Sequence, residues 1–283
     1  MESRNPVFAN SAEFNGRGAQ TAAVSDPSQW QIDLDASGTP THTVPGTGRM
    51  TLESVVEKTA VTLGLVIATA AAAWFFIGEV VNEAGFTTDA MNTAYAFAMG
   101  GAIVGLVLSL VNSFKKKISP ALVLAYAVAE GIFVGAFSKI VSSYVGDPTI
   151  VFQAVLGTMV AFGATLAAYK FFNIQVTDKF RKIVTISIFA FVGVMLVNFV
   201  LSITGVLESG GLRGFNGLGL AVSAIAVVLA VFMLIMDFDY VERGVAAQLP
   251  ERESWRAAFG LTVTLIWLYI EILRILAILR GND

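Results

Sequence analysis

The chain has no cysteine, a single histidine and few charged residues. The absence of cysteine excludes disulfide scaffolds, thiolate metal sites and a cysteine nucleophile, and His42 alone in a polar stretch leaves no basis for a histidine-dependent triad. Charged residues make up 14% of the chain, against about 25% in soluble domains, while 55% of residues are hydrophobic. The net charge of −3 gives no indication of a nucleic-acid partner. This composition predicts a membrane protein.

The N-terminal segment differs in composition from the rest of the chain. It is rich in Ser, Thr, Gly and Pro, shows no apolar periodicity, and ends in the turn-rich run SGTPTHTVPGTG at residues 37–48. Such a segment buries too little apolar surface to offset the entropy lost on ordering. No apolar stretch follows Arg4, so the segment does not resemble a secretory signal. We predict a disordered tail over residues 1–50 and a transmembrane domain over residues 51–283.

Seven long apolar runs follow the tail, each about as long as the roughly 20 residues that a helix needs to cross a bilayer. Continuous rather than alternating apolarity predicts helices and not a β-barrel. The expected fold is therefore all-α, a polytopic bundle of seven transmembrane helices. The predicted spans are 59–81, 91–112, 119–142, 150–172, 183–206, 217–238 and 257–279.

The cations lie mostly on one side of this predicted topology. Fourteen of the 18 Lys and Arg residues fall in the tail or in the loops after the second, fourth and sixth spans. The other side has only Lys139, Arg213 and Arg280, and Arg274 lies inside the last span. The positive-inside rule then places the N-terminus in the cytoplasm and the C-terminus outside. This orientation agrees with an odd number of spans.

Small and neutral polar residues inside the spans indicate how the helices pack. Glycines four residues apart allow the backbones of neighbouring membrane helices to approach closely. Two asparagines within spans are expected to form hydrogen bonds between helices. These residues are Gly101 with Gly105, Gly131 with Gly135, Asn112 and Asn198.

Ionisable residues within or at the end of a span are candidate functional residues, because an ionisable side chain in hydrocarbon costs at least about 2.5 kcal/mol. By helical rise, Glu130 lies roughly 16 Å and Glu271 roughly 21 Å from the cytoplasmic side. Asp237 and Asp239 lie at the cytoplasmic end of the sixth span. Arg274 is three residues beyond Glu271, on the same helical face.

Each of these residues also has a structural interpretation. Glu271 and Arg274 form a local ion pair that orients the last helix, Glu130 has a packing role as a hydrogen-bonded carboxyl, and Asp239 is solvated at the water boundary. Two carboxyls that face each other in a low-dielectric interior cannot both ionise easily, so they share a proton. Such a pair senses pH and, when ionised, offers oxygen ligands to a hard cation such as calcium.

Two runs stand out in the last third of the chain, LIMDFDYV at residues 234–241 and WLYIEILRIL at residues 267–276. They resemble the Bax inhibitor-1 family, also called the transmembrane Bax inhibitor motif family, in its bacterial form. The run SPALVLAYAVAEGIFVGAFS at residues 119–138 resembles the start of the family's third helix. The resemblance implies a seven-helix bundle with the last helix surrounded by the others. It also implies a pH-sensing pair of acids linked to calcium leak, at the positions of Asp237 and Glu271.

Three features of this chain differ from that family pattern. Glu271 stands where the family has aspartate, the segment between the two acids is long and contains Pro250, and Arg274 is close to Glu271. The predicted depths of Asp237 and Glu271 differ by roughly 15 Å. Direct pairing then requires the last helix to begin earlier, near Glu253, or a water-filled vestibule between the acids. Otherwise Glu130 is the better partner of Glu271, bridged by Arg274.

The leading hypothesis is a pH-regulated calcium-permeable leak channel or cation transporter of the bacterial plasma membrane. Its sensing and ion-binding residues would be Asp237, Glu271, Glu130 and Asp239, with Arg274 as a gating ion pair and transient calcium at Asp237 and Glu271. The alternative is an interaction protein that modulates a membrane protease or a stress response without transporting ions. We expect no enzyme activity, because Glu271 lacks the GxGD-type context of an intramembrane aspartyl protease and no intramembrane His or Lys supplies the base of a serine protease. We expect no bound cofactor, and a retinal protein would need a lysine in the last span, which has none. The expected partners are the bilayer, calcium ions and protons, and in the alternative a membrane protease.

Overall fold

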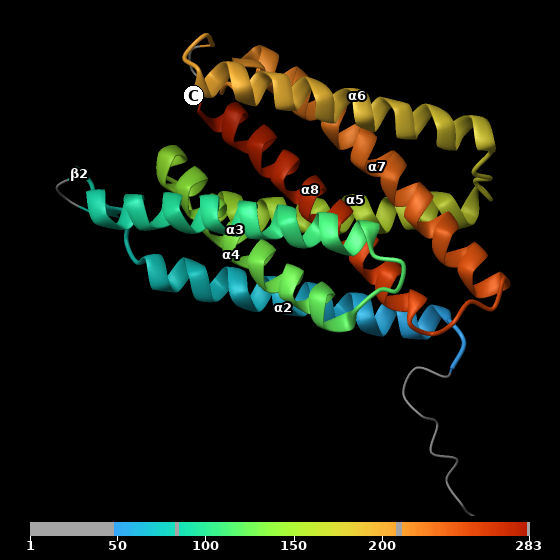
Figure 1. Ribbon diagram of the computed structural model, residues 1–283. Helices are drawn as coiled ribbons and strands as arrows, with labels where there is room; N and C mark the ends of the chain where they lie inside the picture. The colour runs from blue at the N-terminus through green and yellow to red at the C-terminus, as the bar shows by residue number, and fades with distance from the viewer. Residues whose placement is uncertain (1–47, 83–84, 208–210, 282–283) are drawn as a thin grey trace, which may run out of the picture. The chain divides into compact units, whose positions relative to one another are not determined.

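The computed structural model describes residues 48–82, 85–207 and 211–281 (Figure 1). Within these ranges, seven long α-helices are each apolar enough to span a membrane, so the chain is a multi-pass membrane protein. The predicted all-α bundle and all seven predicted spans are confirmed, with some helix ends shifted by up to about two turns. The helices are α2 (Leu52–Ile77), α3 (Thr88–Phe114), α4 (Pro120–Val145), α5 (Thr149–Phe171), α6 (Asp178–Ile203), α7 (Gly217–Ala246) and α8 (Glu253–Arg280).

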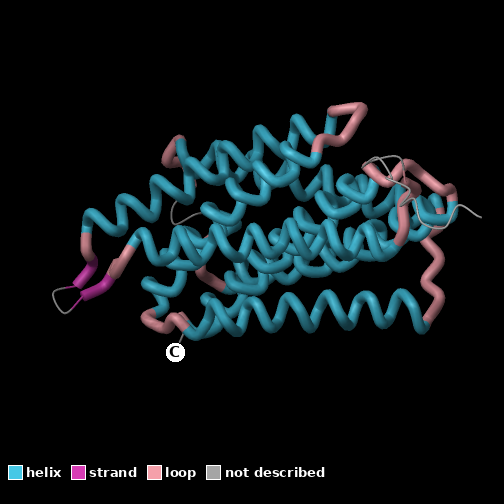
Figure 2. Tube along the Cα trace, turned by 90° about the horizontal axis from the view of Figure 1, so that it is seen from below, coloured by secondary structure: helices cyan, strands magenta, loops and turns pink. Residues whose placement is uncertain are grey.

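Two short elements connect the helices. Strands β1 (Val81–Asn82) and β2 (Gly85–Phe86) pair antiparallel between α2 and α3, and Figure 2 shows this hairpin at one end of the helices. The 3₁₀-helix η2 (Gly211–Arg213) lies between α6 and α7. Because the helices alternate in direction, one end of the bundle contains the starts of α2, α4, α6 and α8, and we call it the Met50 end. The opposite end, where α8 finishes, is the Arg280 end.

Local sequence explains where several helices begin and end. The side chains of Thr51, Thr177 and Asn216 accept hydrogen bonds from backbone N–H groups in the first turns of α2, α6 and α7, which satisfies donors that have no partner within the helix. Pro120 occupies the first position of α4, where its missing N–H costs nothing. Gly146 ends α4 with φ of 75°, a left-handed conformation that glycine adopts without strain.

Helix α8 is the central helix of the bundle. Of its most apolar stretch, 67% is buried, against at most 44% for any other helix, and it packs against α2, α4, α5 and α7. In Figure 1 it runs between α6 and the group formed by α2, α3 and α4. Two hydroxyl pairs join α8 to α2, Ser54 with Ser254 at 2.6 Å and Thr62 with Thr262 at 3.0 Å. The last helix is therefore surrounded by the others, as the family resemblance implies.

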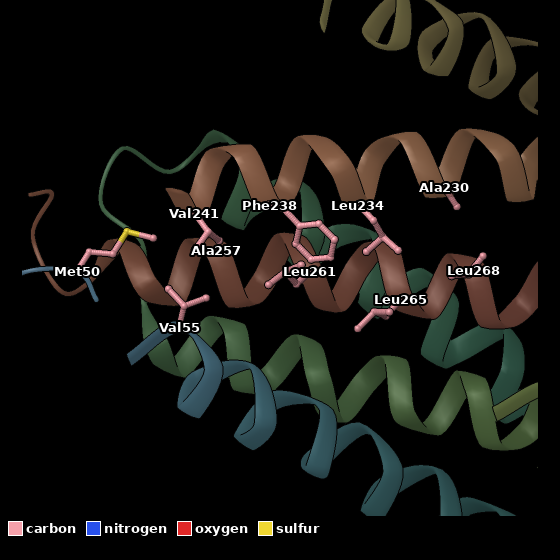
Figure 3. Close-up of a cluster of buried hydrophobic side chains, with 10 residues drawn as sticks. All are labelled: Met50, Val55, Ala230, Leu234, Phe238, Val241, Ala257, Leu261, Leu265 and Leu268. Atoms are coloured by element: carbon pink, nitrogen blue, oxygen red, sulfur yellow. The ribbon is translucent and has the colours of Figure 1, made fainter. Parts of the chain in front are cut away.

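The main hydrophobic cluster lies between α7 and α8 at the Met50 end (Figure 3). Phe238 and Leu234 from α7 point toward Leu261 and Leu265 from α8. Met50, fully buried, closes the cluster, and the Met50 N–H donates to the carbonyl of Leu249 at 2.7 Å. The last three residues of the predicted tail thus pack on the bundle, whereas residues 1–47 lie outside the described part of the chain.

The predicted close helix contacts are present. A side chain at Gly101 would collide with the α4 backbone at Ala129, and one at Gly135 would collide with the α2 backbone at Ala70. Asn112 on α3 donates to the carbonyl of Leu122 on α4 at 3.2 Å. The contacts of α4 with both α2 and α3 therefore depend on glycine, as its spacing indicates.

Candidate functional site

Asp237 on α7 faces α8, and its partner there is a threonine. The Thr264 hydroxyl lies 2.7 Å from Asp237 Oδ2, and a Cβ added at Gly260 would lie 3.4 Å from Oδ1. Gly260 and Thr264 are one turn apart on α8, so the carboxyl lies against one face of that turn. The acid that we mapped to the family's sensor is therefore held by a hydroxyl.

The Thr264 hydroxyl has two possible acceptors but only one proton. It lies 3.1 Å from the carbonyl of Gly260 as well as 2.7 Å from Asp237. With Asp237 ionised, the hydroxyl donates to the carboxylate. With Asp237 protonated, the acid donates to the hydroxyl, which then donates to Gly260. Both states are satisfied, and the protonation state of Asp237 sets the direction of the hydroxyl.

Glu271 on α8 pairs with Arg213 of η2. The Arg213 guanidinium donates to Glu271 Oε1 at 2.7 Å, and Glu271 is only 2% exposed. Within the described residues, its second oxygen, Oε2, has no hydrogen-bond partner. The structural interpretation paired Glu271 with Arg274, but the hydrogen-bonded cation is Arg213 from the α6–α7 connection. Arg274 attracts Glu271 only at longer range.

Arg274 instead holds the backbone of the same connection. Its Nη2 donates to the carbonyl of Arg213 at 2.5 Å, and its guanidinium lies 5.3 Å from the ring centre of Phe215. On the other side, the Leu212 N–H donates to Asn198 on α6 at 2.7 Å. Arg274 and Asn198 thus fix η2 between α6 and α8, and Arg213 reaches inward from it.

Asp237 and Glu271 do not contact each other. Helix α8 does begin at Glu253, the early start that direct pairing requires. Even so, Thr264, which faces Asp237, precedes Glu271 by seven residues, or roughly 10 Å of helix. The two acids bind different partners at different depths.

Glu130 lies elsewhere, between α3 and α4. A Cβ at Gly105 would lie 2.5 Å from its Oε1, and its carboxyl interacts with Tyr126 one turn earlier. Arg274 does not bridge it to Glu271, since the described groups that act on Arg274 are Arg213, Phe215 and Glu271, and Glu130 is not among them. The predicted Glu130–Arg274–Glu271 arrangement is therefore absent from the described residues.

Asp239 is buried and doubly paired rather than solvated as its structural interpretation supposed. Arg181 from α6 and Arg243 from the next turn of α7 donate to its two oxygens at 2.7 and 2.9 Å, and Asp239 is 7% exposed. Arg243 also donates to the carbonyl of Val176 at 3.0 Å. This cluster fastens α6 to α7 at the Met50 end, which favours a structural role.

Replacing Asp239 with asparagine is expected to lower the free energy of unfolding by about 1 to 2 kcal/mol, since it removes the negative charge and replaces one of the two acceptor oxygens by an NH2 group that cannot accept from arginine. The effect is limited because both arginines are partly exposed and solvent-screened. Denaturant unfolding in detergent measures it. The matched control is Asp89→Asn, an exposed acid in α3. Equal stability of the two variants would contradict the role given to Asp239.

A cavity of about 490 Å³ adjoins Glu271. It lies between α6 and α8, and its polar wall consists of Glu271, Arg213, Asn198 and Ser202. Glu271 lines this cavity, and its Oε2 has no hydrogen-bond partner among the described residues. Arg213 therefore binds only one of the two carboxylate oxygens of Glu271.

Comparison with known proteins identifies the family. The sequence model of the family described as Bax inhibitor 1 like matches residues 5–281. The chain belongs to the Bax inhibitor 1 like family. No curated protein matches the chain. The resemblance drawn from its two C-terminal runs is thereby confirmed.

In this Bax inhibitor 1 like protein the acids Asp237, Glu271 and Asp239 each bind a different partner. Among the described residues, no group of three or more His, Asp or Glu side chains is placed to hold a metal ion. A calcium ion prefers six to eight oxygen ligands, so a cation at Asp237 or Glu271 would keep much of its water.

Sequence reasoning missed Arg213 and Thr264 as partners in this Bax inhibitor 1 like protein. Arg213 was treated only as a cation of the outer loops, because nothing in its glycine-rich connection indicates that it folds inward to an acid on α8. Thr264 gave no signal, because a threonine in a membrane helix usually bonds its own backbone, as Thr158 and Thr165 do. Identifying either partner required the three-dimensional register of α8.

Proposed function

We propose that this protein is a pH-regulated leak for calcium or a similar hard cation, with no enzyme activity. It would reside in the bacterial plasma membrane with the Met50 end toward the cytoplasm. The charge distribution supports this orientation, because described cations gather in the loops and first helical turns at the Met50 end, such as Lys115, Lys182 and Arg256.

The contact between Asp237 and Thr264 carries the proposal. A carboxyl within a membrane helix is costly, yet here both of its protonation states have hydrogen-bond partners. The α7–α8 contact therefore tolerates a change in charge without losing hydrogen bonds. This supports a sensor that consists of one acid and one hydroxyl rather than two acids.

A second contact supports a closed path at the opposite end. Arg213 neutralises Glu271 in the half of the bundle near the Arg280 end. A guanidinium on that carboxylate takes the place that a passing cation would use. We propose that opening requires Arg213 and η2 to move away from Glu271.

Replacing Asp237 with asparagine is expected to abolish most of the pH dependence of cation entry. Entry into dye-loaded proteoliposomes should rise between about pH 6 and 8 for the wild type, as a carboxyl shielded from water loses its proton and attracts cations. The side-chain amide of the Asp237→Asn variant stays neutral throughout, so entry should remain at its low acidic value. Calcium-sensitive fluorescence measures the flux at each pH.

The matched control is Asp178→Asn, which removes an exposed carboxylate at the start of α6 and should leave the profile unchanged. A wild-type profile retained by Asp237→Asn would remove Asp237 from the mechanism. Silence of folded wild-type protein at every pH would overturn the leak itself. It would favour the alternative of a regulator that binds a membrane protease.

A further inference from the structure

An apolar cavity of about 320 Å³, whose lining residues include no acid, lies in the half of the bundle near the Arg280 end. Four helices form its walls, α2, α4, α5 and α8. Its deepest wall is the buried face of α8, with Leu265, Ile266 and Tyr269. A cavity of this size is at the lower end of the range for small-ligand sites, about 300 to 1,000 Å³.

The few polar atoms that line the cavity already have partners. The Ser138 hydroxyl donates to the carbonyl of Val134 at 2.6 Å and lies 2.7 Å from the Tyr269 hydroxyl. Thr158 donates to the carbonyl of Ala154 at 2.7 Å. No polar group is offered to a ligand, and an apolar cavity does not hold water. The occupant must therefore be hydrocarbon.

The cavity opens sideways toward the membrane. Helices α2 and α5 both pack against α8 but have little contact with each other. The lining residues on these two helices include exposed apolar side chains, Ile67 and Phe75 on α2 and Val155 and Met159 on α5. In a membrane-spanning bundle such side chains face lipid, so an acyl chain has a direct route in.

A cation lies beside the wall of the cavity toward the Arg280 end. The Lys139 ammonium sits 4.4 Å from the ring centre of Trp74, which itself lines the cavity. Lys139 lies 19 residues beyond Pro120, or roughly 29 Å along α4, which is about the thickness of the hydrocarbon core. Glu79 also attracts this ammonium, so the pair presents one cation and one carboxylate at headgroup depth.

We propose that this cavity binds one acyl chain of a membrane phospholipid, whose phosphate pairs with Lys139. The apolar walls accept the chain and the lateral opening lets it enter from the bilayer. Lys139, stacked on Trp74, provides the charge that a phosphate requires at the level where headgroups lie. This site is independent of the proposed cation leak.

Native mass spectrometry of the detergent-solubilised protein, titrated with a phospholipid, tests the site. The wild type should retain one lipid at low molar excess. Val155→Trp, which fills the opening, should weaken binding at least about tenfold, and Lys139→Met about threefold to tenfold. The matched controls are Val192→Trp on the lipid-facing side of α6 and Lys179→Met at the opposite end, and both should bind as the wild type does.

Photo-crosslinking of the unmodified protein gives a second test that depends on no variant. A phospholipid with a diazirine within its acyl chain should label Leu265, Ile266 or Tyr269, which are buried and out of reach of bulk lipid. A lysophospholipid should compete for this labelling, and glycerol phosphate should not. Labelling confined to exposed residues, or unchanged binding by Val155→Trp and Lys139→Met, would overturn the proposal.

Discussion

Replacing Arg213 with methionine is expected to lower the free energy of unfolding by about 3 kcal/mol. The change removes the cation that is hydrogen-bonded to Glu271 and leaves only the longer-range attraction of Arg274. Removing one partner of a buried pair typically costs about 3 to 5 kcal/mol. We expect the lower end, because the Arg213 side chain is 24% exposed and the Glu271 side chain 2%. Denaturant unfolding in detergent measures the loss, with the exposed Arg252→Met as the control.

A double-mutant cycle separates the ion pair from other effects of the substitution. Arg213→Met with Glu271→Leu should recover most of the lost stability, since replacing both members of a buried pair by apolar residues is often neutral. Glu271→Leu alone should cost less than Arg213→Met alone, because the partly exposed Arg213 retains access to water. The backbone contact from Arg274 to the Arg213 carbonyl survives in every variant. Additive effects of the two substitutions would show that the pair does not couple them.

The same variants test the proposed closure of the leak. Arg213→Met removes the cation that neutralises Glu271 and should raise cation entry several-fold in folded protein. The double variant lacks the carboxylate as well, so its entry should return to the wild-type level or below. Entry unaffected by Arg213→Met would leave the ion pair with a structural role only.

The sequence predicted the helices well because their signal is local. A span needs about 20 apolar residues, and the runs before and after Lys115 to Lys117 stand out from composition alone. The structure moves the ends outward where polar residues continue a helix beyond the apolar run, as from Phe238 to Ala246 in α7. Close helix packing at Gly135 was also predictable, because small residues four positions apart in membrane helices typically mark contacts between helix backbones.

The partners of the buried acids were not predictable in the same way. Which residue faces Asp237 depends on the rotation and register of α8, and the sequence favoured Glu271 because an acid is more conspicuous than Thr264. Glu271 pairs with Arg213, which reaches it because the α6–α7 connection folds inward. A count of charges on each side of the membrane instead assigns Arg213 to a solvated loop. The sequence identified the acids that are energetically unfavourable in a membrane. The residues that pair with them, Thr264 and Arg213, come from segments distant in the sequence.

Replacing Gly135 with alanine is expected to lower the free energy of unfolding by about 2 to 3 kcal/mol, at the upper end of the range for overpacking. The added methyl group would meet the backbone of Ala70 on α2, which cannot turn away as a flexible side chain could. Helices α2 and α4 would have to separate along one of the most extensive contacts in the bundle. Thermal or denaturant unfolding in detergent measures the change.

Gly163→Ala is the matched control for this substitution. Gly163 lies within α5, and an added Cβ there would have no neighbour within 4 Å. Alanine is the better helix former by up to about 1 kcal/mol, so Gly163→Ala should be neutral or stabilising. The two variants make the same chemical change in the same kind of helix, and their effects should have opposite signs. Equal changes in the free energy of unfolding would mean that α2 and α4 can accommodate a methyl group at Gly135, and that the close contact there does not stabilise their packing.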